Sequence, residues 1–237
     1  MRILVTGGCS FSECLSPFIN TWPKHLASSL NEYNHIPTGM GSQGNGLISR
    51  RVIYQVIQSL KECNSSDLLV GVMWSGPSRH DVYIQNTPAL INEDGYMENP
   101  TKFVPDGKGS WIIMNHSWTT ESSQNYYQHH HDTIGQYIYS NEHILRTQWF
   151  LKLHNIKYFM ATYTNEVFQK NTHPDIKYLY EQIDFDQFLP AGGEYEWCRD
   201  YSGLEFPVKG DNHPSSEQHR LFTEQVILPF LKKKEYI

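Results

Sequence analysis

The feature that most constrains the fold of this chain is a run of seven almost continuously apolar residues, Leu68–Trp74. A strand of this kind is covered on both faces, which is typical of parallel sheets that lie between helices. Two further short apolar runs, residues 2–6 and 157–162, have the same character. Helical periodicity separates these runs, most clearly over residues 46–61. Strands that alternate with helices predict an α/β fold, a three-layer α/β/α sandwich around a central parallel sheet.

The rest of the chain completes this pattern and adds one exception. An extended piece is expected over residues 36–41, and residues 163–210 are rich in loops. Residues 76–133 break the rhythm with prolines, glycines and short aromatic stretches, so we expect an aromatic-rich insertion of loops and hairpins without a helix. At 237 residues the chain is expected to form a single domain, 1–237. Helices are expected at about 21–30, 134–154, 175–182 and 216–231.

Composition excludes several classes of protein. The formal net charge of −6 argues against a nucleic-acid partner. No segment approaches the roughly 20 apolar residues that cross a bilayer, and the apolar run at residues 2–6 is too short for a signal-peptide core. The four cysteines show no CxxC spacing and are too few for a disulfide framework. These features predict a cytoplasmic protein without a membrane partner.

The first candidate for chemistry follows the first strand, in the segment Gly7–Glu13. Ligands of parallel α/β sheets bind beyond the carboxyl ends of the strands, and glycines let the backbone turn sharply there. Ser10 would leave the sheet at this turn with its hydroxyl facing the crevice, as a nucleophile does. The alternative is structural, because Ser10 and Glu13 also match a capping box at a helix start.

A histidine precedes the last predicted helix, in the segment Gly210–Ser215. Pro214 biases His213 toward an extended backbone, which keeps its ring off the helix. Asp211, two residues earlier, can bond one ring nitrogen and leave the other for a serine. The alternative is a polar turn that caps the helix, since Ser215 and Gln218 form a capping-box pattern.

A third segment, Gly39–Gly46, holds four glycines in eight residues between a strand and a helix. Such a backbone can present N–H groups to an anion. It lacks the Lys-Ser/Thr ending of a phosphate-binding P-loop. It can therefore serve as an oxyanion-hole loop, or be a flexible turn.

In order and spacing these segments resemble the SGNH hydrolases, also called the GDSL family, over the whole chain except the 76–133 insertion. Gly8–Ser12 is similar to the first family block, with Cys9 in place of Asp, and Ser42–Asn45 is similar to the second. Asp211–Ser215 is similar to the last block in its shorter Asp-x-His-Pro form. The resemblance implies a flavodoxin-like SGNH fold, a Ser10–His213–Asp211 triad, and the N–H groups of Ser10 and Gly44 as oxyanion donors.

The third family block departs from the pattern. After the strand Leu68–Met73 the family places an Asn whose amide completes the oxyanion hole, and this chain has Trp74-Ser75-Gly76 instead. Three alternatives stay open for the missing donor: Ser75, Asn45 or another backbone N–H. Trp74 and Arg79 are predicted to contact substrate, with Arg79 binding an anionic group or pairing with a local carboxylate.

Metal and cofactor chemistry are not predicted. Three consecutive histidines, His129–His131, cannot all face one ion, and no suitably spaced carboxylate or Cys accompanies them. The aromatic side chains of the insertion either pack its hairpins or line a substrate groove. Cys9 lies beside Ser10, but adjacent side chains diverge, so it is not predicted as the nucleophile.

The resulting prediction is a serine esterase that needs no cofactor and acts on a small-molecule or carbohydrate ester, an O-acetylated carbohydrate being the specific hypothesis. Two alternatives remain: an acyltransferase on the same scaffold, and an inactive SGNH-like binding module. The missing Asn of the third block favours the second of these.

Overall fold

The computed structural model describes residues 1–14, 19–85, 110–114 and 121–237. Five parallel strands form the central sheet in the order β2-β1-β3-β6-β7, the strand order of flavodoxin-like sheets. This confirms the predicted α/β/α fold with its central parallel sheet. The strands are β1 (Arg2–Gly7), β2 (Tyr33–Pro37), β3 (Leu68–Trp74), β6 (Lys157–Thr162) and β7 (Phe188–Gly193).

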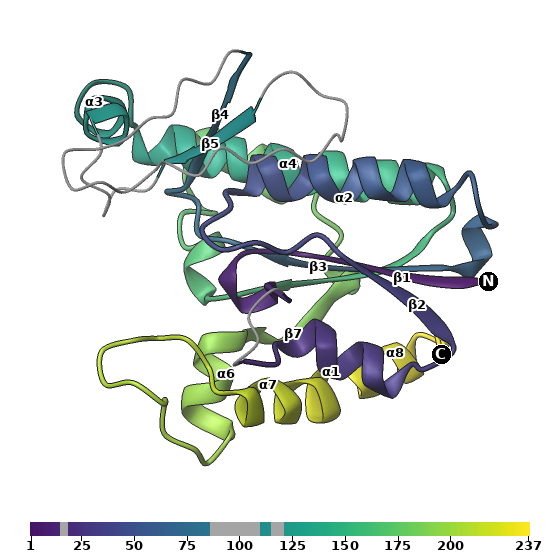
Figure 1. Cartoon of the computed structure of the whole chain (residues 1–237). Helices are drawn as coiled ribbons and strands as arrows, with labels where there is room; N and C mark the ends of the chain where they lie inside the picture. Colours follow the sequence, from purple (N-terminus) through teal and green to yellow (C-terminus); the bar gives the residue numbers. More distant parts are fainter. Residues whose placement is uncertain (15–18, 86–109, 115–120) are drawn as a thin grey trace.

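Helices cover both faces of the sheet (Figure 1). One face carries α2 (Asn45–Ser59), α4 (Thr133–Leu153) and α5 (Pro174–Tyr180). The other carries α1, α6, α7 and α8. Their bounds are α1 (Trp22–Ser29), α6 (Glu194–Tyr201), α7 (Ser216–Phe222) and α8 (Leu228–Lys233), with a π-helical turn, Thr223–Ile227, between the last two. Short 3₁₀ turns are η1 (Ser10–Ser12), η2 (Ser65–Asp67), η3 (Asn165–Phe168) and η4 (Phe185–Gln187).

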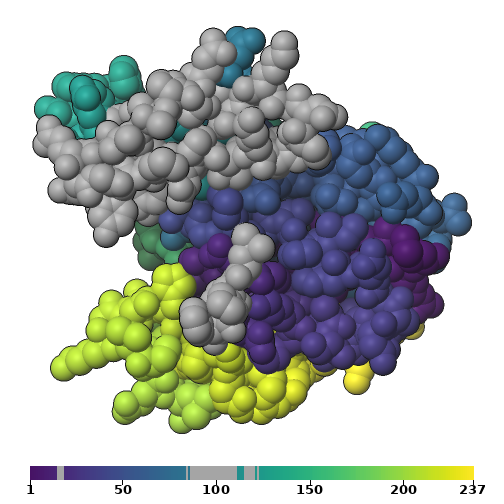
Figure 2. All heavy atoms as spheres, in the orientation of Figure 1, coloured from purple at the N-terminus to yellow at the C-terminus, as the bar shows by residue number. Residues whose placement is uncertain are grey.

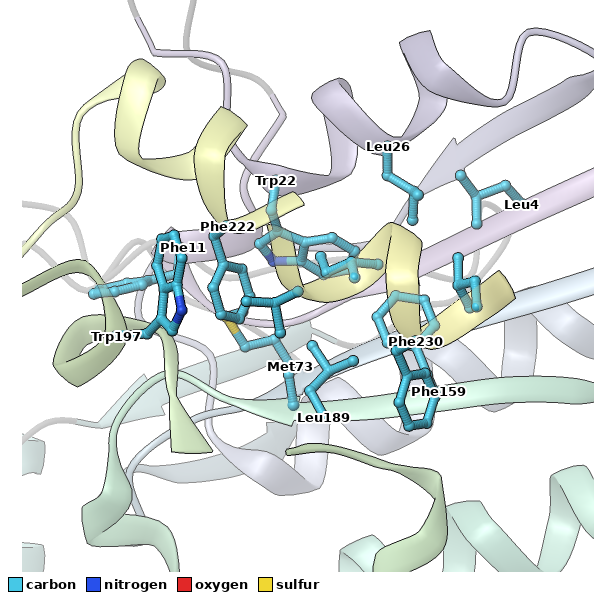
Figure 3. Close-up of a cluster of buried hydrophobic side chains, with 14 of the residues drawn as sticks. Leu4, Phe11, Trp22, Leu26, Met73, Phe159, Leu189, Trp197, Phe222 and Phe230 are labelled. Atoms are coloured by element: carbon cyan, nitrogen blue, oxygen red, sulfur yellow. The ribbon is translucent and has the colours of Figure 1, made fainter. Parts of the chain in front are cut away.

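The two faces of the sheet bury separate apolar clusters, as alternating side chains of covered strands require. Leu4 and Met73 point to the cluster under α1 and α7, which also holds Trp22, Phe159 and Phe222 (Figure 3). Val5, Val72 and their neighbours point to the opposite cluster under α2 and α4. All seven residues of β3 are buried, as its composition predicts.

Several elements differ from the sequence-based expectation. Residues 163–210 contain β7 and α6, where we expected loops and one short helix. Residues 76–133 contain the antiparallel pair β4 (His80–Ile84) and β5 (Ser110–Met114), as predicted, but also a helix, α3 (Glu121–His129), which was not. The other residues of that predicted insertion, 86–109 and 115–120, lie outside the described part.

The fold places the candidate site at the carboxyl edge of the sheet. The chain leaves β1 first to β2 on one side and then reaches β3 on the other. Such a reversal leaves a crevice beyond the ends of β1 and β3, which is where parallel α/β sheets bind ligands. In Figure 1, β1 starts at the labelled N-terminus on the right, so this edge lies on the left.

Candidate active site

The turn after β1 depends on a glycine. Gly8 has a φ of 154°, and a Cβ there would lie 2.3 Å from Ser12 Oγ and 2.9 Å from the Met73 carbonyl oxygen. No other residue type fits so close to both the turn and β3. The chain therefore turns off the sheet at Gly8 and enters η1 at Ser10.

Hydrogen bonds hold this turn at both ends. The Ser12 N–H donates to the Cys9 carbonyl at 2.8 Å, and the Trp22 indole N–H donates to Ser12 Oγ at 2.9 Å. At the start of the turn, the Gln43 side-chain amide donates to the Gly8 carbonyl at 2.7 Å. These partners are buried, so the backbone that carries the candidate nucleophile is fixed by groups that water does not reach.

The three predicted catalytic side chains meet in one hydrogen-bonded chain. His213 Nε2 lies 2.7 Å from Ser10 Oγ, although the two residues are 203 positions apart. His213 Nδ1 lies 2.5 Å from Asp211 Oδ1, and the same oxygen accepts the His213 backbone N–H at 3.0 Å. Hydrogen bonding from His213 lowers the pKa of the Asp211 carboxyl. The N-cap residue of η1 is Cys9, which makes no side-chain cap bond, and the hydroxyl of Ser10 faces the histidine. The capping-box alternative for Ser10 is therefore wrong.

Neighbouring residues in the chain and the ring of Phe11 orient His213. Pro214 is buried, and Ser215 and Gln218 form the predicted capping box at the start of α7. The phenyl ring of Phe11 packs against the imidazole of His213, with ring centroids 5.2 Å apart. The capping box and the histidine therefore belong to the same turn, and the two interpretations of this segment are compatible.

Asp211 and His213 lie at the surface. Their side chains are 47% and 45% exposed. The yellow-green segment between α6 and α7, which carries Asp211, stands out from the surface at the lower left of Figure 2. Water therefore competes for the carboxylate of Asp211. This carboxylate orients the His213 ring less strongly than a buried carboxylate would.

A second histidine–carboxylate pair lies beneath the site and is fully buried. His219 Nδ1 is 2.7 Å from Glu194 Oε1, with side chains 2% and 0% exposed. Burial raises the pKa of Glu194, against the opposing effect of His219. The ring of Phe11 meets His219 edge-on, with ring centroids 6.2 Å apart, and also packs against His213. This pair joins α6 to α7 under the triad. It was not predicted, because α6 itself was not predicted.

The predicted oxyanion role of Gly44 is not met. Its N–H donates to Asp81 Oδ1 at 3.0 Å, and Asp81 Oδ2 accepts the Leu47 N–H at 2.8 Å. Asp81 thus caps the first turn of α2 from β4, a position in which a carboxylate is favourable. Burial nevertheless raises the pKa of Asp81 to about 6. An acidic cap from a distant strand has no local sequence signature, and for this reason it was missed.

Asn45 is also engaged elsewhere. Its amide donates to the Ser75 carbonyl at 2.9 Å, and its oxygen accepts the Ser75 N–H at 2.8 Å. A further short contact joins the same amide to Ser140. Asn45 therefore ties the end of β3 to α2 and α4. Among the predicted donors, the Ser10 N–H and the buried hydroxyl of Ser75 have no partner within the described residues.

The two predicted substrate contacts have different outcomes. Trp74 is fully buried in the cluster under α2, and its indole N–H points to Met160 Sδ at 3.3 Å, so the prediction for Trp74 is wrong. The guanidinium of Arg79 lies over the ring of Tyr163, 5.6 Å from its centroid, and lines a surface cavity. Its role in binding substrate stays a prediction.

Other features bear on cofactors and on membranes. Within the part of the chain that the structure describes, no three His, Cys, Asp or Glu side chains converge as metal ligands. None of the helices in that part is both long and apolar enough to span a bilayer. All four cysteines are free thiols. The sequence matches no known protein-family model, and no curated protein is significantly similar to it.

Proposed function

We propose that this protein is a serine esterase of the SGNH type that hydrolyses a carboxylic ester through Ser10, His213 and Asp211. The observation that carries the proposal is the continuous hydrogen-bond chain from the Ser10 hydroxyl through both ring nitrogens of His213 to Asp211. The order of the glycine, serine and histidine segments supports the same family. So does the position of the triad beyond β1 and β3.

The reaction follows from the positions of these groups. His213 Nε2 takes the proton of Ser10 as Oγ forms a bond to the ester carbonyl carbon. The tetrahedral intermediate collapses, the bond to the alcohol oxygen breaks, and His213 returns the proton to the leaving alcohol. Water then attacks the acyl-enzyme and loses a proton to His213. The bond between Ser10 Oγ and the acyl carbon breaks, His213 returns the proton to Oγ, and the carboxylic acid is released. Asp211 holds the ring so that Nε2 faces the serine.

The negative charge on the carbonyl oxygen needs donors, and two groups near the ends of β1 and β3 have no partner in the described part of the chain. The Ser10 N–H has no partner among the described residues, and neither has the hydroxyl of Ser75 at the end of β3. We propose these two in place of the Gly44 N–H and the Asn45 amide, which are already bonded. Each well-placed donor contributes roughly 3–4 kcal/mol to such a transition state.

For the substrate we propose an O-acylated carbohydrate. Tyr83 and Tyr139 are 52% and 51% exposed, and Tyr83 packs on Trp111 with ring centroids 5.4 Å apart. Exposed aromatic rings offer flat apolar faces on which sugar rings stack. Tyr139 also lines the cavity that contains Arg79.

The test is hydrolysis of p-nitrophenyl acetate together with labelling by a fluorophosphonate probe. We expect wild type to hydrolyse the ester and to be labelled at Ser10. Ser10→Ala and His213→Ala should each lose at least about a thousandfold in kcat/KM, because one removes the nucleophile and the other its general base. Ser28→Ala and His173→Ala, at exposed sites on other elements, are the matched controls and should keep wild-type rates. Equal rates in all five proteins would refute the proposal.

A second candidate function has one observation in its favour. Because Gly44 and Asn45 are both bonded elsewhere, a binding module without catalysis is the alternative. It predicts no fluorophosphonate labelling of a folded wild-type protein, together with binding of an acetylated sugar that Ser10→Ala leaves unchanged.

A further inference from the structure

A cavity separate from the triad lies between α2, α4 and the start of β4. Its volume is about 280 Å³, and the triad residues do not line it. Helices α2 and α4 run side by side over the sheet, with β4 near their ends in Figure 1. The lining includes the side chains of Arg50, Arg79, His80, His143, Gln136 and Tyr139. We call this the cation pocket.

The cationic groups of the cation pocket converge on one small volume. At Gly46 a Cβ would lie only 2.7 Å from Arg50 Nη1 and 3.0 Å from His143 Nε2. A glycine at this position lets both nitrogens approach the first turn of α2. The guanidinium of Arg50 lies over the ring of Trp111, with its Cζ 4.4 Å from the ring centroid. A cation–π contact therefore helps to hold this guanidinium at the pocket wall.

The positive charge here exceeds the negative charge, because within the described residues one carboxylate lies near two guanidinium groups. Asp81 is the acid that lines the pocket in the described part of the chain, and both of its oxygens already accept backbone N–H groups. Over the same residues, none of Arg50, Arg79 and Arg146 has a carboxylate within ion-pair distance. One buried nitrogen each of Arg79 and Arg146 makes no hydrogen bond there.

Mutual repulsion is the electrostatic consequence. Burial first, and then the nearby Arg146, Arg50 and His80, together lower the pKa of His143 to about 3. Burial and then Arg50 lower the pKa of Arg146. A neutral His143 can still donate one ring N–H to an anion. Partly buried cations without an ion-pair partner are unfavourable, so an anion between them would stabilise the pocket.

We propose that the cation pocket binds a small anionic group, a carboxylate or a phosphate, between the guanidinium groups of Arg50 and Arg79. Planar guanidinium groups match both of these groups through paired N–H donors. Gln136 and Tyr139 add uncharged donors at the wall. The volume lies at the low end for ligand sites, so it suits one substituent or one small molecule and not a polymer.

The anion can come from two sources. It is either an acidic group carried by the substrate, or a separate small anion. The binding itself does not depend on the proposed esterase activity, because it is measured without turnover. Ser10→Ala should therefore bind the anion as wild type does, even if the esterase proposal fails.

The experiment is calorimetric titration of the full chain with inorganic phosphate and, separately, with glucuronate. We expect saturable binding of at least one anion by wild type. Arg50→Gln and Arg79→Gln should each weaken it by about tenfold or more, the effect of losing one charged hydrogen bond. Arg2→Gln, which removes an equal charge from an exposed pair with Glu32, is the control and should bind normally.

Two outcomes would overturn the proposal: no binding of either anion by folded wild type, or wild-type affinity in both arginine variants. Thermal unfolding without ligand shows which variants are folded. If losing the contact between Arg50 and Trp111 destabilises Arg50→Gln, the test relies on Arg79→Gln. To separate the two sources, phosphate is added to hydrolysis assays. Competition against an acidic ester but not against p-nitrophenyl acetate assigns the pocket to the substrate, and no competition with either assigns it to a separate anion.

Discussion

Replacing Asp211 tests how a surface carboxylate serves the histidine beside Ser10. In the structure, one oxygen of Asp211 accepts both the ring Nδ1–H of His213, at 2.5 Å, and its backbone N–H, at 3.0 Å. Asp211→Ala removes the oxygen that accepts both bonds, and Asp211→Asn keeps an oxygen in place but removes the charge. The two variants therefore separate orientation of the ring from electrostatic stabilisation.

The expected loss follows from exposure. A hydrogen bond to a charged group contributes about 1.5–3 kcal/mol, and the 47% exposure of Asp211 places this bond at the lower end because water screens it. At about 1.4 kcal/mol per tenfold change in rate, Asp211→Ala should lower kcat/KM by about ten- to thirtyfold. A buried triad carboxylate is worth roughly 10⁴-fold.

Asp211→Asn should lose less than Asp211→Ala. Because a single oxygen makes both bonds, an asparagine oxygen can accept both and leave its NH₂ group toward solvent. In a buried triad the amide instead faces the ring and stabilises the wrong tautomer. The order of rates should therefore be wild type, then Asn, then Ala.

The assay is the steady-state hydrolysis of p-nitrophenyl acetate at neutral pH. Asp200→Asn is the matched control, since Asp200 is an exposed aspartate paired with Arg199 on α6, and it should keep the wild-type rate. A thousandfold loss in Asp211→Ala, or an Asn variant worse than Ala, would show that the carboxylate is not the weak, solvent-screened partner that its exposure indicates.

Two further predictions concern the elements around the site. Gly8→Ala should abolish esterase activity and lower the free energy of unfolding by about 1–3 kcal/mol, because its Cβ would meet Ser12 and the Met73 carbonyl. Gly203 is also at positive φ but in open space, so Gly203→Ala should keep activity. Chemical denaturation and rate measurements compare the two variants. Burial raises the pKa of Asp81 to about 6 from its ordinary 3.8, so ionisation weakens the fold as pH rises through that window. Relative to Asp81→Asn, wild type should lose on the order of 2–3 kcal/mol of stability between pH 4 and pH 7.5, and a relative gain in denaturation experiments would contradict the assigned cause.

Elements with strong local signals were predicted well. The apolar strand Leu68–Trp74 and the periodic helix near 46–61 lie where expected. The apolar run of the strand and the apolar stripe of the helix are both patterns of residues close together in the sequence. β7 was missed because it is an edge strand with Pro190 and two glycines, residues that central strands exclude. Helix α3 was missed because it is largely polar, with no apolar stripe to reveal it.

The sequence alone determined which residues could form the candidate triad. Ser10 follows a strand end and His213 precedes a capped helix, and both signals come from a few adjacent residues. Their common edge followed from the rule for parallel sheets. The 2.7 Å approach of the two side chains then depends on the strand order, which brings together ends of the chain 203 positions apart.

Only the tertiary structure decided which donors remain available and where the cations gather. The Gly44 N–H donates to Asp81 on β4, and the side chain of Trp74 is buried in the core. The cation pocket likewise assembles Arg50 from α2 with Arg79 from the loop before β4. The type of a residue determines which hydrogen bonds its side chain can make. Long-range packing determines which partner it meets, and local patterns in the sequence do not encode that packing.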